Sequence, residues 1–150
     1  MALESRISRL EREWNIADGK IQILPFGVGD RDSICYVTRY DDNNGLGSKL
    51  SATSDENTEE CRTVALDSML REDGSYFIKA DVESYEYRVL TGAKETIRRC
   101  APKIAICIYH NTIDFYSIPL LLKELNPDYH FAVRHYSSSL AETVLYAYLD

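Results

Sequence analysis

The segment YFIKADVESYE, residues 76–86, decides the fold of this chain. It begins with mostly apolar residues after a turn, which predicts a strand over Tyr76–Ala80. Asp81 and Glu83 follow that strand directly, and a helical pattern begins at Ser84. In open α/β sheets, ligands bind beyond the carboxyl ends of the parallel strands. The segment therefore predicts both a strand–helix unit and a candidate site.

The residues after this segment continue the alternation of strand and helix. Spacing of apolar residues predicts a helix at Ser84–Cys100, a buried strand at Lys103–Tyr109, a helix at 113–125 and alternating strands at Tyr129–His135 and Thr143–Leu149. This order is typical of an α/β fold with a mostly parallel sheet that closes on an antiparallel C-terminal hairpin.

The first half of the chain has weaker signals. A Gly/Asp/Asn/Ser-rich stretch separates its strands and predicts a loop. The predicted elements are an amphipathic helix at residues 2–15, strands at Ile21–Phe26 and Ser33–Arg39, a loop at 41–60, a short strand at Cys61–Ala65 and a helical turn at Leu66–Leu70.

Length and composition bound the function. The 150 residues fit one domain, residues 1–150, and the net charge of −7 argues against a nucleic-acid partner. No run approaches 18 apolar residues, and the charged amino terminus lacks a signal-peptide core, so we expect no membrane association. The four cysteines show no metal-ligand spacing and are interpreted as reduced thiols of a cytoplasmic protein.

Polar residues after three predicted strands are expected at one rim of the sheet. They are Gly29 and Asp30 after the first strand, Asp81 and Glu83 after the middle strand, and His110 after the next. Each group has a purely structural interpretation as well. Asp30 would be a turn residue, Asp81 a helix cap, Glu83 and Glu86 an exposed helix start, and His110 a buried, hydrogen-bonded histidine.

The central motif resembles the FkbM family of S-adenosylmethionine-dependent methyltransferases. That family has a Leu-Asp pair, then Ile-Lys-x-Asp-Val-Glu-Gly-x-Glu, then Val-Leu-x-Gly-Ala. The chain matches this pattern with Asp67, the stretch Phe77–Glu86 and the stretch Val89–Ala93. Weaker similarity extends the resemblance from about residue 20 to residue 149, through Phe26–Asp30, Pro102, Ile108–His110, Tyr129–Tyr136 and Glu142–Tyr146.

The resemblance implies a Rossmann-like class I methyltransferase fold with the sheet order 3-2-1-4-5-7-6. It implies transfer of a methyl group from S-adenosylmethionine to a hydroxyl of a sugar or small natural product, with no metal. Asp81 and Glu83 would lie near the methyl group and acceptor, and His110 would be the base. Gly29, Asp30 and Asp81 would contact the cofactor, while Lys79 and Asp67 would support the rim.

Two departures from the family pattern affect these expectations. Ser84 stands where the family has glycine, which is a strained choice if the backbone there needs a positive φ. The Gly-rich turn after the first strand and the acidic residue after the second are not found in this chain. We therefore expect an incomplete domain that lacks the first two strands, binds cofactor weakly or not at all, and is inactive by itself.

Loss of two strands would expose one edge of the Tyr76–Ala80 strand. Three alternatives follow: the strand at Ile21–Phe26 pairs with that edge, another polypeptide supplies the missing strands, or the chain is a truncated product of a longer enzyme. Truncation is the favoured hypothesis. Two other functions stay open. One is a non-catalytic binding or scaffold module that recruits a partner or second copy through the edge. The other is a metal-dependent hydrolase that uses Asp81, Glu83 and His110.

Overall fold

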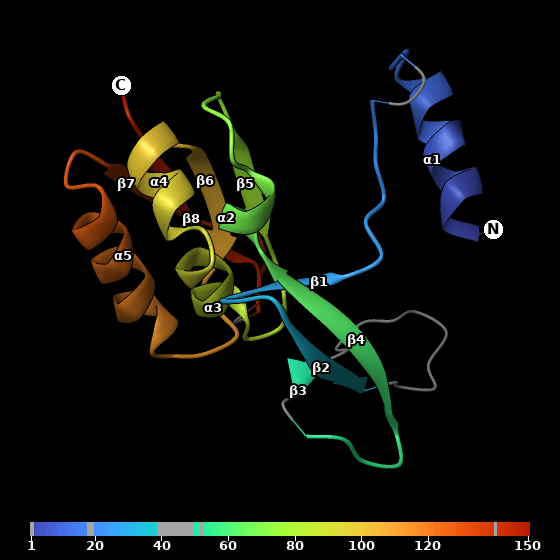
Figure 1. The fold of residues 1–150 in the computed structure, drawn as a ribbon. Helices are drawn as coiled ribbons and strands as arrows, with labels where there is room; N and C mark the ends of the chain where they lie inside the picture. The colour runs from blue at the N-terminus through green and yellow to red at the C-terminus, as the bar shows by residue number, and fades with distance from the viewer. Residues whose placement is uncertain (1, 18–19, 39–49, 52, 140) are drawn as a thin grey trace.

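The structure is a computed structural model that describes residues 2–17, 20–38, 50–51, 53–139 and 141–150. Over these residues it is a mixed α/β fold with two four-stranded sheets (Figure 1). The expectation of one mostly parallel sheet is therefore wrong, because most neighbouring strands in both sheets run antiparallel.

The second half of the chain builds the better-packed sheet. Its strands are β5 (Phe77–Ala80), β6 (Lys103–Cys107), β7 (His130–His135) and β8 (Thr143–Tyr148), in the order β5-β6-β8-β7. β5 runs parallel to β6, and β8 runs antiparallel to both of its neighbours. This order agrees with strands 4, 5, 7 and 6 of the implied arrangement, and the antiparallel C-terminal hairpin is confirmed.

Three helices cover one face of this sheet, as Figure 1 shows: α3 (Glu86–Thr91), α4 (Lys94–Cys100) and α5 (Asp114–Leu125). Alternate strand residues point toward them and form the main hydrophobic core. Its side chains include Ile78, Leu90, Ile97, Ile104, Ile106, Ile118, Leu122 and Leu145. The single helix predicted at Ser84–Cys100 is instead two helices, which meet at Gly92.

Gly92 lies at the joint between the two halves of the molecule. A Cβ atom at this position would overlap the backbone carbonyl oxygen of Gly29. The carbonyl oxygen of Gly92 accepts a hydrogen bond from the Asp67 amide at 2.8 Å. The residue thus brings the end of α3 against β1, a close approach that a side chain would prevent.

The first half of the chain builds the second sheet, from β1 (Gly27–Gly29), β2 (Ser33–Thr38), β3 (Leu50–Ser51) and β4 (Thr58–Ala65). Their order is β1-β4-β2-β3. The short helix α2 (Leu66–Met69) follows β4 and leads back toward β5.

Two predictions in this half need correction. The strand predicted at Ile21–Phe26 is wrong, because the chain becomes a strand only at β1, where Gly27 to Gly29 align with Thr63 to Ala65 of β4. Residues 58–60 of the predicted loop belong to β4, which is longer than the strand predicted at Cys61–Ala65. Residues 41–49 and 52 lie outside the described part of the chain.

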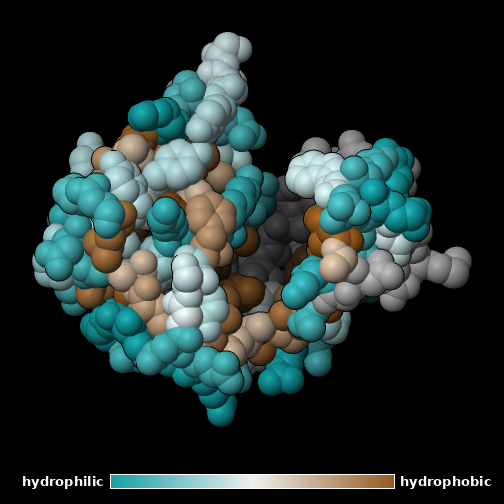
Figure 2. All heavy atoms as spheres, turned by 90° about the horizontal axis from the view of Figure 1, so that it is seen from above, coloured by the Kyte–Doolittle hydropathy of each residue, from teal (hydrophilic) through white to brown (hydrophobic). Residues whose placement is uncertain are grey.

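The predicted amino-terminal helix is confirmed as α1 (Ala2–Glu13), and apolar residues at its carboxyl end are exposed. Leu10 is 43% exposed, and Trp14, just after the helix, is 73% exposed. Figure 1 shows α1 apart from both sheets. Figure 2, which looks down on the molecule, shows a hollow with hydrophobic side chains between the main body and the part that carries α1.

β5 lies at the edge of its sheet, with β6 as its one partner among the described strands. Of the three alternatives for this edge, pairing with the strand before Gly27 is wrong, because β1 pairs with β4. The four cysteines are free thiols, and Cys35 and Cys107 are buried. Among the described helices, none has the length and apolarity needed to cross a membrane.

Candidate functional site

Four polar side chains meet where β5 and β6 end. Asp81 and Glu83 come from the turn after β5, Glu86 opens α3, and His110 follows β6. Because β5 and β6 are parallel neighbours, their carboxyl ends lie at the same edge of the sheet. The topology therefore brings residues 81–86 and 110 together, as the sequence predicts.

The turn after β5 has an unusual backbone. Glu83 has a φ of 49° and Ser84 a φ of 77°, both in the left-handed region. The helix begins only at Glu86, with Tyr85 as its N-cap residue. Ser84 is therefore a conformationally strained residue rather than a favourable helix start, since a left-handed residue with a side chain costs about 1–2 kcal/mol. This explains in physical terms why glycine suits that position.

His110 and Glu86 form a buried pair. The His110 Nδ1 atom lies 2.6 Å from the Glu86 Oε1 atom, and the Val82 amide donates to the same oxygen at 2.9 Å. The Glu86 side chain is fully buried and the His110 side chain is 8% exposed. With Glu86 as the acceptor of this contact, the His110 Nδ1 atom donates the hydrogen bond and Nε2 takes no part in it.

The Nε2 atom of His110 is the polar atom of interest in this site. It is buried and has no hydrogen-bond partner in the structure. Two carboxylate oxygens lie 3.6 Å from it, Oδ1 of Asp81 and Oε2 of Glu83. A lone pair between two negative charges is an unfavourable arrangement until a proton or another cation arrives there. The geometry therefore leaves Nε2 facing two carboxylate oxygens with no hydrogen bond of its own.

Asp81 is held in its ionised form by its neighbours. Partial burial raises the pKa of Asp81. The hydrogen bond from the Cys107 thiol, the Lys79 ammonium and the hydrogen bond from the Tyr109 phenol lower it more, so the pKa of Asp81 lies below its ordinary value of 3.8. Lys79 Nζ lies 3.3 Å from Oδ2, and the Tyr109 hydroxyl donates to Oδ1 at 3.2 Å. Asp81 is consequently a fixed negative charge at neutral pH.

The two donors to Asp81 keep their own protons. Burial, together with the Asp81 carboxylate, raises the pKa of the Cys107 thiol to about 12. Burial and the same carboxylate also raise the pKa of Tyr109 well above its ordinary value of 10. Both groups therefore remain neutral donors near pH 7.

The remaining predicted site residues lie elsewhere. The ion pairs of His110 are to Asp81, Glu83 and Glu86, and Asp30 is not among them. The Asp30 carboxylate pairs instead with Arg88 Nη1 at 3.3 Å. Gly29 ends β1, Asp30 follows it, and both lie against the end of α3. The structure thus brings together three of the five predicted site residues.

Glu86 is the functional residue that sequence reasoning missed. Its interpretation as part of an exposed helix start is wrong, because its side chain is fully buried. A signal was present in the sequence, since residue 86 is on the same helical face as Val89, Leu90 and Ala93. A charged residue on an apolar face needs a buried partner, and His110 is that partner. The interpretation of Asp81 as a helix cap is also wrong, because Tyr85 holds that position.

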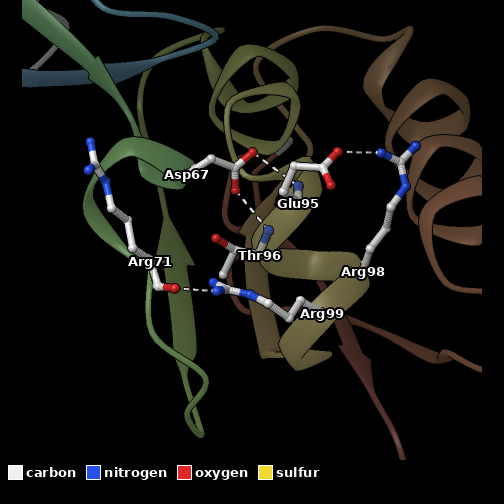
Figure 3. Close-up of a pocket in the computed structure, with 6 residues that line it drawn as sticks. All are labelled: Asp67, Arg71, Glu95, Thr96, Arg98 and Arg99. Carbon is white, nitrogen blue, oxygen red and sulfur yellow. Dashed lines mark hydrogen bonds and ion pairs between the residues drawn. The ribbon is translucent and has the colours of Figure 1, made fainter.

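A second polar pocket, of about 400 Å³, lies at the start of α4 and is drawn in Figure 3. Asp67 accepts hydrogen bonds there from the amides of Glu95 at 3.0 Å and Thr96 at 2.8 Å. Arg98 pairs with Glu95, and Arg99 donates to the Arg71 carbonyl. The charged groups of this pocket therefore have partners within the chain. Asp67 joins α2 to α4, so we interpret the pocket as structural.

The four-residue site contains atoms that suit a cation. Asp81, Glu86 and His110 each offer a ligand atom within 4.8 Å of the others. However, the 2.6 Å contact between Glu86 and His110 is a hydrogen-bond distance, shorter than two ligands of one metal ion would show at about 2.1 Å from it.

Comparisons with known proteins give the family and the fold of the chain. The family model described as "Methyltransferase FkbM domain" matches residues 4–136. The crystal structure of the methyltransferase FkbM from Methylobacillus flagellatus KT superimposes with a TM-score of 0.69 at 23% identity. The match covers 95% of this chain and 32% of that protein, so this chain spans about a third of its length and shares its fold over that part. No curated protein matches the chain.

Proposed function

The chain belongs to the FkbM methyltransferase domain family, and on that premise we propose that its strand-end site serves methyl transfer from S-adenosylmethionine to a hydroxyl of a sugar or small natural product. One observation carries the proposal. The Nε2 atom of His110 is buried without a hydrogen-bond partner, while Asp81 and Glu83 face it and Glu86 fixes the opposite ring nitrogen.

S-Adenosylmethionine, when bound, supplies a methyl group on a positively charged sulfur atom. An acceptor hydroxyl that takes this methyl group forms an O–C bond, the C–S bond breaks with its electron pair on sulfur, and the hydroxyl proton needs a base. Asp81 and Glu83 place two negative charges where the positive sulfur and the acceptor meet. This favours the cation over a neutral ligand of the same shape.

Glu83 is the residue that contacts the acceptor hydroxyl. Its carboxylate is 37% exposed, whereas the His110 ring lies behind it with 8% exposure. The proton leaves the acceptor to Oε2 of Glu83 and comes to rest on Nε2 of His110, 3.6 Å away. Glu86 then stabilises the imidazolium through Nδ1, as a buried carboxylate does in other histidine pairs. His110 is thus a base reached through Glu83.

Cofactor contact is the first test of this proposal. Because this chain offers mainly the carboxylate end of a binding site, we expect S-adenosylmethionine to bind with a Kd on the order of 1 mM. Saturation-transfer NMR should detect it on the intact chain, and Asp81→Asn and Glu83→Gln should weaken it. Glu95→Gln on α4 is the matched control. No contact at 10 mM cofactor, or equal binding by all three variants, would overturn the proposal.

Methyl transfer is the second test. We expect at most slow transfer by this incomplete domain, measured with isotope-labelled cofactor at 10 mM and a panel of hydroxyl acceptors. His110→Gln and Glu83→Gln should reduce that rate by at least about 100-fold, as loss of a general base does. Addition of a chelator should leave the rate unchanged. A rate that falls with chelator would instead favour the metal-dependent alternative.

A binding module that pairs through the β5 edge is the second candidate function, and we propose a second copy of this chain as its partner. Lys103 donates to the Tyr76 carbonyl, so the even-numbered residues of β5 face β6. The backbone groups of Phe77 and Lys79 therefore face the open side. A groove of about 310 Å³ lies there, with mostly apolar walls that include Val28, Leu66, Leu70 and Val82.

An antiparallel pair of β5 strands centred on Ile78 satisfies these open backbone groups. In this register Phe77 lies opposite Lys79 of the second copy, so no like charges face each other. Light scattering should show a dimer of the 17.2 kDa chain. Phe77→Pro, which removes an outward amide, should give a monomer, and Phe77→Thr should remain dimeric. A wild-type monomer at high concentration would eliminate this candidate.

A further inference from the structure

The face of the second-half sheet that points away from α3, α4 and α5 carries a group of tyrosines. Ala105, Cys107 and Val144 form a small buried cluster on it, and Tyr109 and Tyr146 pack against that cluster. Beside it lies a hollow of about 480 Å³ lined by Ala132, Arg134, Tyr136, Tyr146 and Tyr148. We define these five residues as the tyrosine hollow.

The tyrosine hollow contains a cation without a counterion. Arg134 is exposed, and no carboxylate in the described part of the chain lies within ion-pair distance of it. Arg134 Nη1 donates a hydrogen bond to the Val133 carbonyl at 2.9 Å, which leaves most of the guanidinium donors open. In a chain with a net charge of −7, an unpaired arginine among aromatic rings points to an anionic ligand.

The tyrosine hydroxyls form an ordered polar wall. The hydroxyls of Tyr136 and Tyr146 lie 2.8 Å apart, and that hydrogen bond raises the pKa of Tyr146. Two hydroxyls that share one hydrogen bond still offer lone pairs and a donor to a hydroxylated ligand. The ring faces offer the apolar contact that a sugar ring or similar skeleton uses.

The hollow begins at the same end of the sheet as the candidate site. Cys107 of β6 aligns with Val144 of β8, which aligns with Arg134 of β7. Neighbouring strands lie about 4.8 Å apart, so the backbone at Arg134 is about 10 Å from that at Cys107. Tyr109 connects the two places, because it packs on this face and donates to Asp81. The hollow and the candidate site are therefore neighbours at one end of the sheet.

We propose that the tyrosine hollow binds the methyl acceptor, and that this acceptor is a hydroxylated ring with an anionic group, a carboxylate or a phosphate. Arg134 holds the anionic group, and Tyr136 and Tyr146 contact the ring. A hydroxyl at the other end of the molecule then reaches Glu83. This inference rests on the proposed methyl transfer for its role, but the binding site stands on the geometry of the hollow.

Three probes test the hollow on the intact chain: glucuronate, glucose 6-phosphate and uncharged methyl glucoside. Titration followed by amide NMR shifts should show the charged rings binding at least about ten-fold more tightly than the uncharged ring. The shifts should centre on residues 132–136 and 144–148. Comparison of glucuronate with glucose 6-phosphate decides between a carboxylate and a phosphate.

Two arginine variants complete the test. Arg134→Gln should weaken the charged probes at least about ten-fold, whereas Arg98→Gln on α4 should change nothing. Equal binding by Arg134→Gln and wild type, or equal binding of the uncharged ring, would overturn the inference. The experiment needs neither cofactor nor methyl transfer. Arg134-dependent binding without any transfer would therefore reject the proposed function and leave the anion site standing.

Discussion

The two halves of this molecule differ in how they bury their side chains. The half from β5 to β8 packs three helices against a sheet and holds the main core, with Leu90, Ile106 and Leu122 fully buried. The half from α1 to β4 leaves Ile34 and Trp14 largely exposed. A sheet with one covered face is stable, whereas a ribbon of short strands depends on what covers it. The site is built on the stable half.

Replacement of a leucine by alanine should give the largest difference in unfolding free energy between the two halves. Leu90→Ala removes a fully buried side chain from the main core and should lower the free energy of unfolding by about 3 kcal/mol. Leu10→Ala, the same change on the exposed face of α1, should alter it by less than about 0.5 kcal/mol. Urea unfolding followed by circular dichroism measures both. Similar losses for the two variants would show that α1 is packed in solution.

The contact between the halves should break at Gly92. Gly92→Ala places a methyl group against the Gly29 carbonyl oxygen, which forces α3 and β1 apart and should cost about 2 kcal/mol. Gly74→Ala is the control, because its new Cβ would meet only the movable side chain of Tyr76 at 3.3 Å. If the two variants unfold alike, the close approach at Gly92 is not maintained.

The same contrast explains what the sequence could predict. The motif at residues 76–86 and the patterns after it predict β5, β6, α5 and the closing hairpin, because these elements alternate between a covered face and a core. The strand predicted at Ile21–Phe26 fails because strand formation depends on the partner, and β4 aligns with residues 27–29. An apolar run does not identify the strand with which it pairs.

The site shows a similar division. Asp81, Glu83 and His110 follow neighbouring parallel strands, so topology alone brings them together. Asp30 was expected beside them because the first strand was placed in the same sheet, whereas β1 belongs to the other sheet. The pairing of Glu86 with His110 joins residues 24 positions apart, and only the helical position of Glu86 hinted at its burial.

A substitution at Ser84 should stabilise the better-packed half of the molecule. Its φ of 77° suits glycine, so Ser84→Gly should raise the free energy of unfolding by about 1 kcal/mol. Ser84→Ala keeps a Cβ in the left-handed region and should give no gain. Thermal unfolding of the two variants against wild type measures the difference. A Ser84→Gly protein less stable than wild type would show that the serine hydroxyl matters more than the relief of the backbone.

The smallest expected effect concerns the charge of Asp81 and its dependence on pH. The pKa of Asp81 is lowered in the folded chain, so its ionised form contributes stability above its ordinary value of 3.8. That contribution disappears as the pH falls below 3.8 through the lowered folded value. Asp81→Asn lacks the contribution at every pH. The stability gap between wild type and Asp81→Asn should therefore be largest near pH 7 and shrink toward pH 2, as urea unfolding at both pH values would measure. Asp128→Asn, at an exposed position away from the site, serves as the control. A gap that grows on acidification would mean that Asp81 is held in its protonated form, and the negative charge proposed to face the sulfonium would be absent.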